Sequence, residues 1–418
     1  METKSRIDFI ALFLFVAITC IGIASVYSAT SEAGAFTLLE GRSGKQIMWF
    51  GVSVFLGIII FILNAQFFEA FSMYIYIALM LLLVAVLFIG ADINGARSWI
   101  RIGSFSLQPS EFAKYGTAFA ISSILSTIGF SWEKKADILK IAAIVLIPMG
   151  LIVLQGDTGS ALVFLSFFIV FYREGLTPNI LVLGIAAIVI FVLTLVFGSL
   201  AFSIGTVLCL LVFYAFTYTN KKVLLPSIAI AAVVILFSLS VQFLFDNVLQ
   251  SHQQKRIQVT LNLIEDNQGA GYNVNQSKIA IGSGGFSGKG FLNGSHTKGD
   301  FIPEQETDFI FCTIGEEGGW VLSSITILLF VLLVLRLFHL AGRAKKKFKR
   351  IFIYSLASII FFHLMVNVGM TIGLMPVIGI PLPLISYGGS SILAFGIFIF
   401  TALKLDASRV YDLQSHYI

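Results

Sequence analysis

The segment FIPEQETDFIFCTIGEEGG, residues 301–319, stands where a long polar stretch meets a long apolar run. Asp308 lies at that boundary, and three apolar residues, 309–311, follow it directly. An acid at the border between water and membrane costs free energy unless it has a partner or a chemical role. We predict that Asp308 is a general base at an extracytoplasmic membrane surface. The alternative is a helix N-cap, in which Thr307 or Asp308 begins the following helix.

The composition indicates a membrane protein. The chain has 418 residues, of which 57% are hydrophobic and 12% are charged, and its mean hydropathy is +0.95. Soluble domains carry about 25% charged residues. The apolar residues form long runs, and roughly 20 such residues cross a hydrocarbon core of about 30 Å. Because a membrane span must satisfy its own backbone groups, we predict an all-α, polytopic helical membrane protein with a single transmembrane domain over residues 1–418.

We expect about 10–12 transmembrane helices and one long extracytoplasmic loop at about 246–310. The expected spans are 7–28, 46–63, 70–90, 109–129, 138–154, 159–172, 179–197, 200–218, 223–245, 311–338, 351–373 and 389–404. The count is twelve if the run 179–245 divides into three helices, with residues 197–199 as a thin turn between two of them. It is ten if that run is not divided in this way.

The lysines and arginines orient the chain. With the N-terminus in the cytoplasm, 17 of the 27 lie inside, nine lie outside and Lys114 lies in a span. The segment AGRAKKKFKR, residues 341–350, is the strongest cytoplasmic anchor. The positive-inside rule therefore predicts a multi-pass protein with both termini in the cytoplasm. This topology also explains the net charge of +5, so we expect no nucleic-acid partner.

We expect no framework of metal ligands. The three cysteines, Cys20, Cys209 and Cys312, fall in separate expected spans. We interpret them as small, buried apolar residues.

The expected outer loop DINGARSWIRIGSFSLQP, residues 92–109, carries an aromatic residue between two cations. Trp99 either stacks on a sugar or anchors the chain at the membrane interface. Arg97 and Arg101 flank it and are candidates for binding an anionic group.

Three charged residues lie in or beside expected spans. Glu111 and Lys114 are three residues apart and therefore share a helix face. A charged pair inside a membrane is expensive, so it is either a structural clamp between helices or a charged site that lines a cavity. Asp157, in QGDTGSA, is either a helix cap or a functional acid.

The long outer loop is a candidate functional segment, since loops of this length are uncommon and usually functional. Residues 275–281 predict a short amphipathic helix lying on the membrane. Lys278 and Lys289 are candidates for binding an anion. The glycines at 282–290 do not have the spacing of a nucleotide phosphate loop. They predict close backbone packing, or backbone N–H groups that cradle a phosphate.

Near the C-terminus, PVIGIPLPLISYGGSS, residues 376–391, contains three prolines and two adjacent glycines. It cannot form a regular helix, so at membrane depth it is buried in protein or lines a water-filled cavity. His363 and Asn367, four residues apart on the preceding span, are interpreted as a hydrogen-bonded packing pair.

Together these segments resemble the SEDS (FtsW/RodA/SpoVE) family of cell-wall polymerases, and the RodA branch more than the FtsW branch. The segments that carry the resemblance are GARSWIRIGSFSLQPSEFAK (95–114), QGDTGSA (155–161), GAGYNVNQSKIAIGSGG (269–285), FIPEQETDFIF (301–311) and GIPLPLISYGGSS (379–391). Two features depart from the family. Its members usually have ten spans, and the segment before GAGY, residues 265–268, lacks their usual Asp-Pro pair.

The resemblance implies a peptidoglycan glycosyltransferase of the bacterial cytoplasmic membrane. Its substrate would be lipid II, a disaccharide-pentapeptide on undecaprenyl pyrophosphate, polymerised at the outer face for cell elongation and rod shape. Its implied partners are a class B penicillin-binding protein and other membrane proteins of the elongation complex. The family's essential loop carboxylate falls on Asp308, its loop tryptophan on Trp99, and its buried acid–lysine pair on Glu111 and Lys114.

The implied reaction is an inverting displacement at the anomeric carbon, in which one carboxylate, Asp308, suffices as general base. The residues expected to bind substrate are Trp99, Arg97, Arg101, Lys278, Lys289, Glu111, Lys114 and Asp157. Cations near the leaving pyrophosphate, with Arg256 as a further candidate, or a divalent ion (Mg²⁺ or Mn²⁺), would stabilise its charge. No other cofactor is expected.

Two other classes of function compete with this one. A lipid II flippase or secondary transporter would use Glu111, Lys114 and Asp157 along a substrate path, although the sequence shows no internal repeat. A scaffold for the penicillin-binding protein would need no acid at position 308.

Overall fold

The structure is a computed structural model of the chain. It describes residues 7–31, 41–93, 96–103, 105–217, 221–247, 249, 251–261, 263–264, 271–299 and 301–409. The expected departure at residues 265–268 lies outside these ranges.

Within the described ranges, ten helices are long and apolar enough to cross a membrane. They are α1 (Phe9–Thr30), α2 (Gly41–Ile62), α3 (Ala65–Ile89), α5 (Lys135–Leu154), α8 (Pro178–Phe197), α9 (Ser199–Thr217), α10 (Lys221–Asn247), α14 (Ile310–Arg343), α15 (Lys347–Thr371) and α16 (Gly389–Ala407). The prediction of a polytopic helical membrane protein is confirmed.

The two other expected spans are helical but differ from this set. The first is α4 (Pro109–Ser126), which carries Glu111 and Lys114 and is buried along most of its length. The second is broken into α6 (Thr158–Leu162), a 3-10 turn at Val163–Ser166, and α7 (Phe167–Arg173). Polar side chains and short segments of this kind are tolerated at membrane depth where neighbouring protein surrounds them.

The chain divides into two compact units, residues 1–175 with 273–418, and residues 176–272. The second unit contains α8, α9, α10 and α11 (Ser251–Thr260). Gly198, with a φ of +81°, ends α8 and so separates it from α9. The Thr194 hydroxyl of α8 donates a hydrogen bond to the Ser238 hydroxyl of α10 at 3.0 Å. The division of residues 179–245 into three helices is therefore confirmed.

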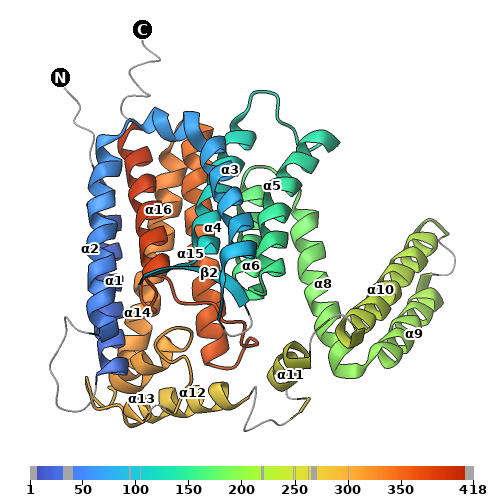
Figure 1. The fold of residues 1–418 in the computed structure, drawn as a ribbon. Coiled ribbons are helices and arrows are strands. Elements are labelled where there is room, and N and C mark those ends of the chain that lie inside the picture. Colours follow the sequence, from blue (N-terminus) through green and yellow to red (C-terminus); the bar gives the residue numbers. More distant parts are fainter. Residues whose placement is uncertain are drawn as a thin grey trace. The chain divides into compact units, whose positions relative to one another are not determined.

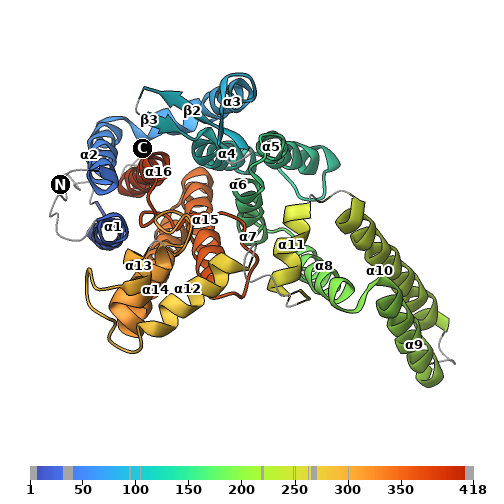
Figure 2. The same ribbon diagram turned by 60° about the horizontal axis from the view of Figure 1, so that its bottom comes forward.

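In the first unit, α15 and α16 are the most buried spans, with 78% and 89% of their apolar windows inside the protein. α15 packs against α14 on one side and α4 on the other, and α16 packs against α2. Figure 2 shows this arrangement, with α15 between α14 and α4. Figure 1 shows α1 and α2 side by side along one flank of this unit.

The expected outer loop 92–109 is a small antiparallel sheet. Its strands are β1 (Ala91–Ile93), β2 (Ala96–Ile102) and β3 (Phe105–Leu107), in the order β1-β2-β3. The long loop contains α12 (Tyr272–Ser283) and α13 (Ser295–Lys298). Residues 275–281 are therefore helical, as predicted, and their position on a membrane stays a prediction.

The prediction that all three cysteines are buried is wrong for two of them. Cys312 is buried, but Cys20 and Cys209 are exposed. They lie on outward faces of α1 and α9, where a membrane helix presents apolar side chains to lipid. A thiol is apolar enough to be tolerated there.

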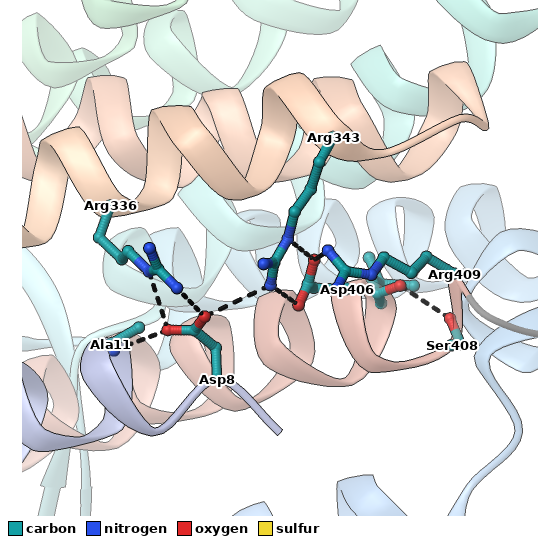
Figure 3. Close-up of polar contacts among 8 residues, drawn as sticks. Asp8, Ala11, Arg336, Arg343, Asp406, Ser408 and Arg409 are labelled. Carbon is teal, nitrogen blue, oxygen red and sulfur yellow. Dashed lines mark hydrogen bonds and ion pairs between the residues drawn. The ribbon is translucent and has the colours of Figure 1, made fainter. Parts of the chain in front are cut away.

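A cluster of ion pairs joins α1, α14 and α16 (Figure 3). It lies at the end of α14 that leads into the lysine-rich segment 341–350. Asp8 caps α1 by accepting a hydrogen bond from the Ala11 N–H at 2.9 Å. The same carboxylate accepts from Arg336 Nε at 3.1 Å, and Arg343 pairs with both Asp8 and Asp406. Burial acts to raise the pKa of Asp8, but the hydrogen bonds from Arg336 and Ala11 and the nearby arginine charges outweigh it, so that pKa lies below its ordinary value.

Candidate active site

The loop between α15 and α16, residues 372–388, lies at the centre of the candidate site. The apolar side chains of its second half are inside the protein: Leu382 and Ile385 are 0% exposed and Leu384 is 1% exposed, whereas Leu374, near the end of α15, is 76% exposed. Ser386 closes a tight turn, because its hydroxyl accepts from the Leu382 N–H at 2.8 Å while its own N–H donates to the Leu382 carbonyl at 2.9 Å. Within the predicted segment 376–391, residues 382–386 are buried in protein, while residues 376–379 and 387–389 are partly exposed.

Asp308 lies in the turn that precedes α14 and is half-buried. α14 begins at Ile310, with Phe309 at the N-cap position, so Thr307 and Asp308 do not hold that position. The Asp308 Oδ2 atom lies 3.3 Å from the point that a Cβ on Gly379 would occupy. Since Gly379 also has a φ of +76°, the backbone of the 372–388 loop approaches this carboxylate in a way that favours glycine.

Asn367 and His363 each bond to this loop. The Asn367 side-chain amide donates to the carbonyl oxygens of Asp308 and Ile380, both at 2.8 Å. His363 Nδ1 lies 2.9 Å from the Pro381 carbonyl oxygen. The two residues bond to other partners and not to each other, so the prediction of a hydrogen-bonded pair is wrong. They fix the loop and the backbone of Asp308.

Glu111 and Lys114 form a buried ion pair with a nitrogen–oxygen distance of 2.8 Å. The Lys114 ammonium also lies 3.0 Å from His363 Nε2 and 5.4 Å from the centre of the Phe395 ring. Because an ammonium can only donate, His363 Nε2 accepts and Nδ1–H donates to the Pro381 carbonyl. The pair therefore clamps α4, α15 and α16 together and orients the histidine. Glu111 Oε2 has no hydrogen-bond partner among the described residues.

Asp157 is a helix cap. Its Oδ1 accepts from the Ser160 N–H at 2.9 Å at the start of α6. Its Oδ2 accepts from the Gln108 side chain at 2.9 Å, which ties α6 to the residue before α4. At Gly159 a Cβ would lie 2.6 Å from the Ile378 carbonyl oxygen, so α6 packs directly on the 372–388 loop. Asp157 thus positions elements around the site.

The aromatic and cationic residues of the outer sheet lie on β2. Trp99 is partly buried and pairs with Ala91 on β1. Arg97 is exposed, lies 3.9 Å from the Asp92 carboxylate, and donates its backbone N–H to the Gln155 carbonyl at 2.8 Å. Arg101 is exposed. The sheet therefore carries two exposed arginines and is bonded, through Gln155, to the segment QGDTGSA (155–161).

The two candidate lysines of the long loop have different surroundings. Lys278, on α12, is exposed, and its Nζ lies 3.1 Å from the point that a Cβ on Gly373 would occupy. It therefore lies against the loop that contacts Asp308. Lys289 forms an ion pair with Glu316 at 2.7 Å and donates to the Ser295 hydroxyl at 2.7 Å.

Glu316 and Glu317, which the sequence patterns did not single out, fasten the long loop to α14. Glu316 is 0% exposed and accepts from the Thr297 N–H at 2.8 Å as well as from Lys289. Glu317 accepts from the Gly294 N–H at 3.3 Å and also from the Ser28 hydroxyl of α1 at 2.6 Å. The sequence could have identified them, because two adjacent acids at the start of an apolar run require partners if they are buried.

The glycine-rich segment packs on the start of α14. The backbone N–H groups of Lys289 and Gly290 donate to the carbonyls of Glu316 and Glu317, both at 3.0 Å. A Cβ at Gly288 would lie 2.0 Å from the Glu317 carbonyl oxygen. Close backbone packing is therefore what the structure shows, and these two N–H groups do not cradle a phosphate.

Arg42, which the sequence patterns also did not single out, contacts both residues 301–311 and residues 376–391. It forms an ion pair with Glu306, and its guanidinium carbon lies 5.8 Å from the centre of the Tyr387 ring. The Tyr387 N–H donates to the Glu306 carbonyl at 2.8 Å. Burial raises the pKa of Tyr387 more than the charge of Arg42 lowers it. These contacts hold residues 301–311 against residues 376–391.

Among the described residues, no group of three or more His, Cys, Asp or Glu side chains is placed to hold a metal ion.

A family model described as "Cell cycle protein", FTSW_RODA_SPOVE, matches residues 6–204 and 179–409. The peptidoglycan glycosyltransferase RodA of Treponema pallidum is 32% identical, over 93% of this chain and 94% of that protein. The peptidoglycan glycosyltransferase MrdB of Escherichia coli K12 is 29% identical, over 93% of this chain and 90% of its own length.

Solved structures agree with these relatives. A chain from a study of the structural coordination of polymerization and crosslinking by a peptidoglycan synthase complex superposes with a TM-score of 0.71 at 27% identity. The alignment covers 97% of this chain and 98% of that one. A variant of the rod shape determining protein RodA of Thermus thermophilus superposes with a TM-score of 0.62 at 25% identity, with the same coverage. The chain therefore belongs to the SEDS (FtsW/RodA/SpoVE) family, whose matched relatives include named peptidoglycan glycosyltransferases.

Proposed function

We propose that this protein polymerises lipid II into glycan strands at the outer face of the cytoplasmic membrane, with Asp308 as general base. The observation that carries the proposal is the convergence of α15 and the 372–388 loop on Asp308. Asn367 of α15 donates to the Asp308 carbonyl at 2.8 Å, and a Cβ on Gly379 of the loop would lie 3.3 Å from Asp308 Oδ2. α6 packs on the same loop at Ile378. Such convergence is what preorganising a catalytic group requires.

The chemistry follows from the substrate. The 4-hydroxyl of the acceptor sugar attacks the anomeric carbon of the donor, and the bond from that carbon to the pyrophosphate oxygen breaks. The pyrophosphate leaves with the bonding electrons, and the hydroxyl proton passes to Asp308. Such general base catalysis contributes typically ~10²–10⁴-fold. Pyrophosphate is a good leaving group, so one carboxylate suffices where glycosidases use two.

Charge that develops on the pyrophosphate needs a cation beside it. Lys278 is the best-placed candidate, because it lies against Gly373 in the loop that contacts Asp308. Arg97 and Arg101 are exposed on β2 and remain candidates. Lys289 is the weakest, since Glu316 already neutralises it. A bound Mg²⁺ or Mn²⁺ would supply further positive charge to the pyrophosphate.

We assign the protein to cell elongation, with a class B penicillin-binding protein as its partner. The assignment rests on the similarity to RodA of Treponema pallidum and to a chain of a peptidoglycan synthase complex. The membrane orientation rests on the positive-inside rule, which puts the lysine-rich connection between α14 and α15, and both termini, in the cytoplasm.

The test of this function is reconstitution of the full chain in lipid vesicles with labelled lipid II, read by polymer formation and by transfer of label across the bilayer. We expect glycan polymer that lysozyme digests. Transfer of label without polymer would contradict the proposal and support a flippase. The structure offers that alternative no added support, since Glu111 pairs with Lys114, Lys114 contacts His363 of α15, and Asp157 caps α6.

A further inference from the structure

α14 is interrupted near its N-terminal end. Gly319 has a φ of +63° and a ψ of −162°, which is not helical, so α14 consists of a half-helix, residues 310–318, and a second helix, residues 320–343. This part of the backbone map is open essentially to glycine alone, and a residue held there usually serves a function. A straight helix would avoid the cost of the break, so the break itself needs a reason.

The 285–290 segment of the long loop bonds to the half-helix. The N–H groups of Lys289 and Gly290 donate to the carbonyls of Glu316 and Glu317, both at 3.0 Å. Carbonyls in the last turn of a helix have no partner within the helix. The segment therefore supplies the donors that the break removes.

The same segment bonds to the second helix. In an unbroken helix, the N–H groups of Trp320 and Val321 would donate to the carbonyls of residues 316 and 317. Here they donate to the carbonyls of Gly285 and Phe286, at 2.9 and 3.2 Å. The Phe286 ring also stacks on the Trp320 ring, with the ring centres 5.6 Å apart and the planes 16° apart. The 285–290 segment thus lies between the two parts of α14 and bonds to both.

The backbones meet too closely at the break to leave room for a side chain. A Cβ on Gly319 would lie 2.3 Å from the Gly288 nitrogen, and a Cβ on Gly288 would lie 2.0 Å from the Glu317 carbonyl oxygen. Gly288 also has a φ of +79°, which favours glycine. The break therefore cannot straighten unless the 285–290 segment moves out.

The half-helix leads directly from Asp308, which lies two residues before Ile310. Ile310 and Gly318 are eight residues apart. That separation is about 12 Å of helix, so a tilt of about 5° at Gly319 would move the start of the half-helix by about 1 Å. A displacement of that size in a reacting group can cost about 100-fold in rate. The direction of the half-helix therefore affects where the proposed base lies.

We propose that the 285–290 segment positions Asp308 for the reaction, because it closes the break at Gly319 and so fixes the direction of the half-helix. This inference rests on the proposed role of Asp308 as general base. The segment acts on Asp308 through the half-helix, so Gly288 is a positioning residue.

The test variant is Gly288→Ala, whose added methyl group would push the 285–290 segment away from the half-helix. The matched control is Gly198→Ala at the end of α8, where φ is +81° and a Cβ would meet no heavy atom of the described ranges within 4 Å. Lipid II polymerisation by the full chain gives kcat and KM. Hydrogen–deuterium exchange, measured by mass spectrometry on peptides that cover residues 285–290 and 316–321, reports opening of the break.

For Gly288→Ala we expect faster exchange in both peptides and a kcat lower by at least about tenfold, with KM within about threefold of wild type. Gly198→Ala should keep the wild-type kcat. A wild-type kcat despite faster exchange in Gly288→Ala would overturn the inference. Unchanged exchange in that variant, or an equal loss of kcat in the control, would also overturn it.

If Gly288→Ala does not fold, Phe286→Ala decides the question, because it removes only the exposed aromatic stack. We expect exchange at Trp320 and Val321 to be faster by about two- to tenfold, with a lower kcat and an unchanged KM. Faster exchange with a wild-type kcat would again contradict the inference.

Asp308→Asn, assayed beside these variants, separates this inference from the proposed function. Wild-type turnover by Asp308→Asn would contradict the proposed function itself. Loss of turnover in Asp308→Asn together with a wild-type kcat in Gly288→Ala would contradict only the positioning role of the 285–290 segment.

Discussion

The side-chain amide of Asn367 donates one hydrogen bond to the carbonyl oxygen of Asp308 and a second to that of Ile380, each at 2.8 Å. A single buried side chain thus fixes the backbone of the proposed base relative to the loop that it faces. Asn367 is a positioning residue, because it acts on the reaction through Asp308.

The first prediction concerns this residue. Asn367→Leu keeps the volume but removes both donors, and leaving a buried carbonyl without a partner costs about 1–3 kcal/mol. We expect lipid II turnover to fall at least tenfold, with the larger effect on kcat than on KM. Steady-state polymerisation kinetics check this. Met365→Leu, a change on the outer face of the same helix, is the control and should change neither constant. Equal activity in both variants would remove Asn367 from the positioning role.

The second prediction concerns Gly379. A Cβ there would lie 3.3 Å from Asp308 Oδ2, and the φ of +76° adds roughly 1–2 kcal/mol of strain for a non-glycine residue. Gly379→Ala should therefore lower the rate of lipid II turnover, because the added methyl group would displace the Asp308 carboxylate. The melting temperature should fall only as much as in a variant with the same backbone strain and no such contact. Gly129→Ala is the matched control: its φ is +85°, and its Cβ would meet no heavy atom of the described residues within 4 Å. A polymerisation assay with melting curves compares the two. Similar activity in both would contradict a close approach at Asp308.

The third prediction concerns the buried pair of Glu111 and Lys114. Removing one charge leaves the other buried without compensation, which costs about 3–5 kcal/mol. We expect Lys114→Met to lower the melting temperature strongly. Combining it with Glu111→Gln should recover much of the loss, because no uncompensated charge then remains. Melting curves of the two single variants and the double variant check this. Additive losses would show that the pair is not the clamp described.

The fourth prediction concerns pH and Asp8. Its folded-state pKa is below the ordinary 3.8, so its ion pairs stabilise the fold at pH values above 3.8. That contribution is lost as the pH falls from 3.8 through the folded-state pKa. Asp8→Asn should therefore destabilise the protein at pH 7, by about 1–3 kcal/mol, and less at pH 3. Melting curves at the two values measure this. A difference between variant and wild type that grows on acidification would contradict it.

The sequence predicted the helical membrane fold well, since long apolar runs decide it. It did not predict the sheet at β1–β3, because strands of three to seven residues give too short an alternation to recognise. It also missed the break of the expected span 159–172 at Val163–Ser166, because that stretch is apolar throughout and local pattern alone does not show a 3-10 turn.

For the candidate site, sequence patterns selected Asp308 and the loop at 376–391 as candidates, but they did not show which residues hold them in place. Arg42 and Glu306 are 264 positions apart in the chain, and nothing local to either residue indicates the partner. Pairings of this kind arise from tertiary packing. Glu316 and Glu317 are different, because two adjacent acids heading an apolar run already indicate buried partners.

The most direct test of the account is the rate of lipid II polymerisation by Asp308→Asn, measured together with lipid II binding. The asparagine keeps the shape of the side chain and cannot accept a proton as a base. We expect binding within about threefold of wild type and a turnover rate lower by about 10²–10⁴-fold. Asp92→Asn, which removes an exposed carboxylate from the outer sheet, should retain wild-type turnover. Turnover by Asp308→Asn within tenfold of wild type would contradict the central claim.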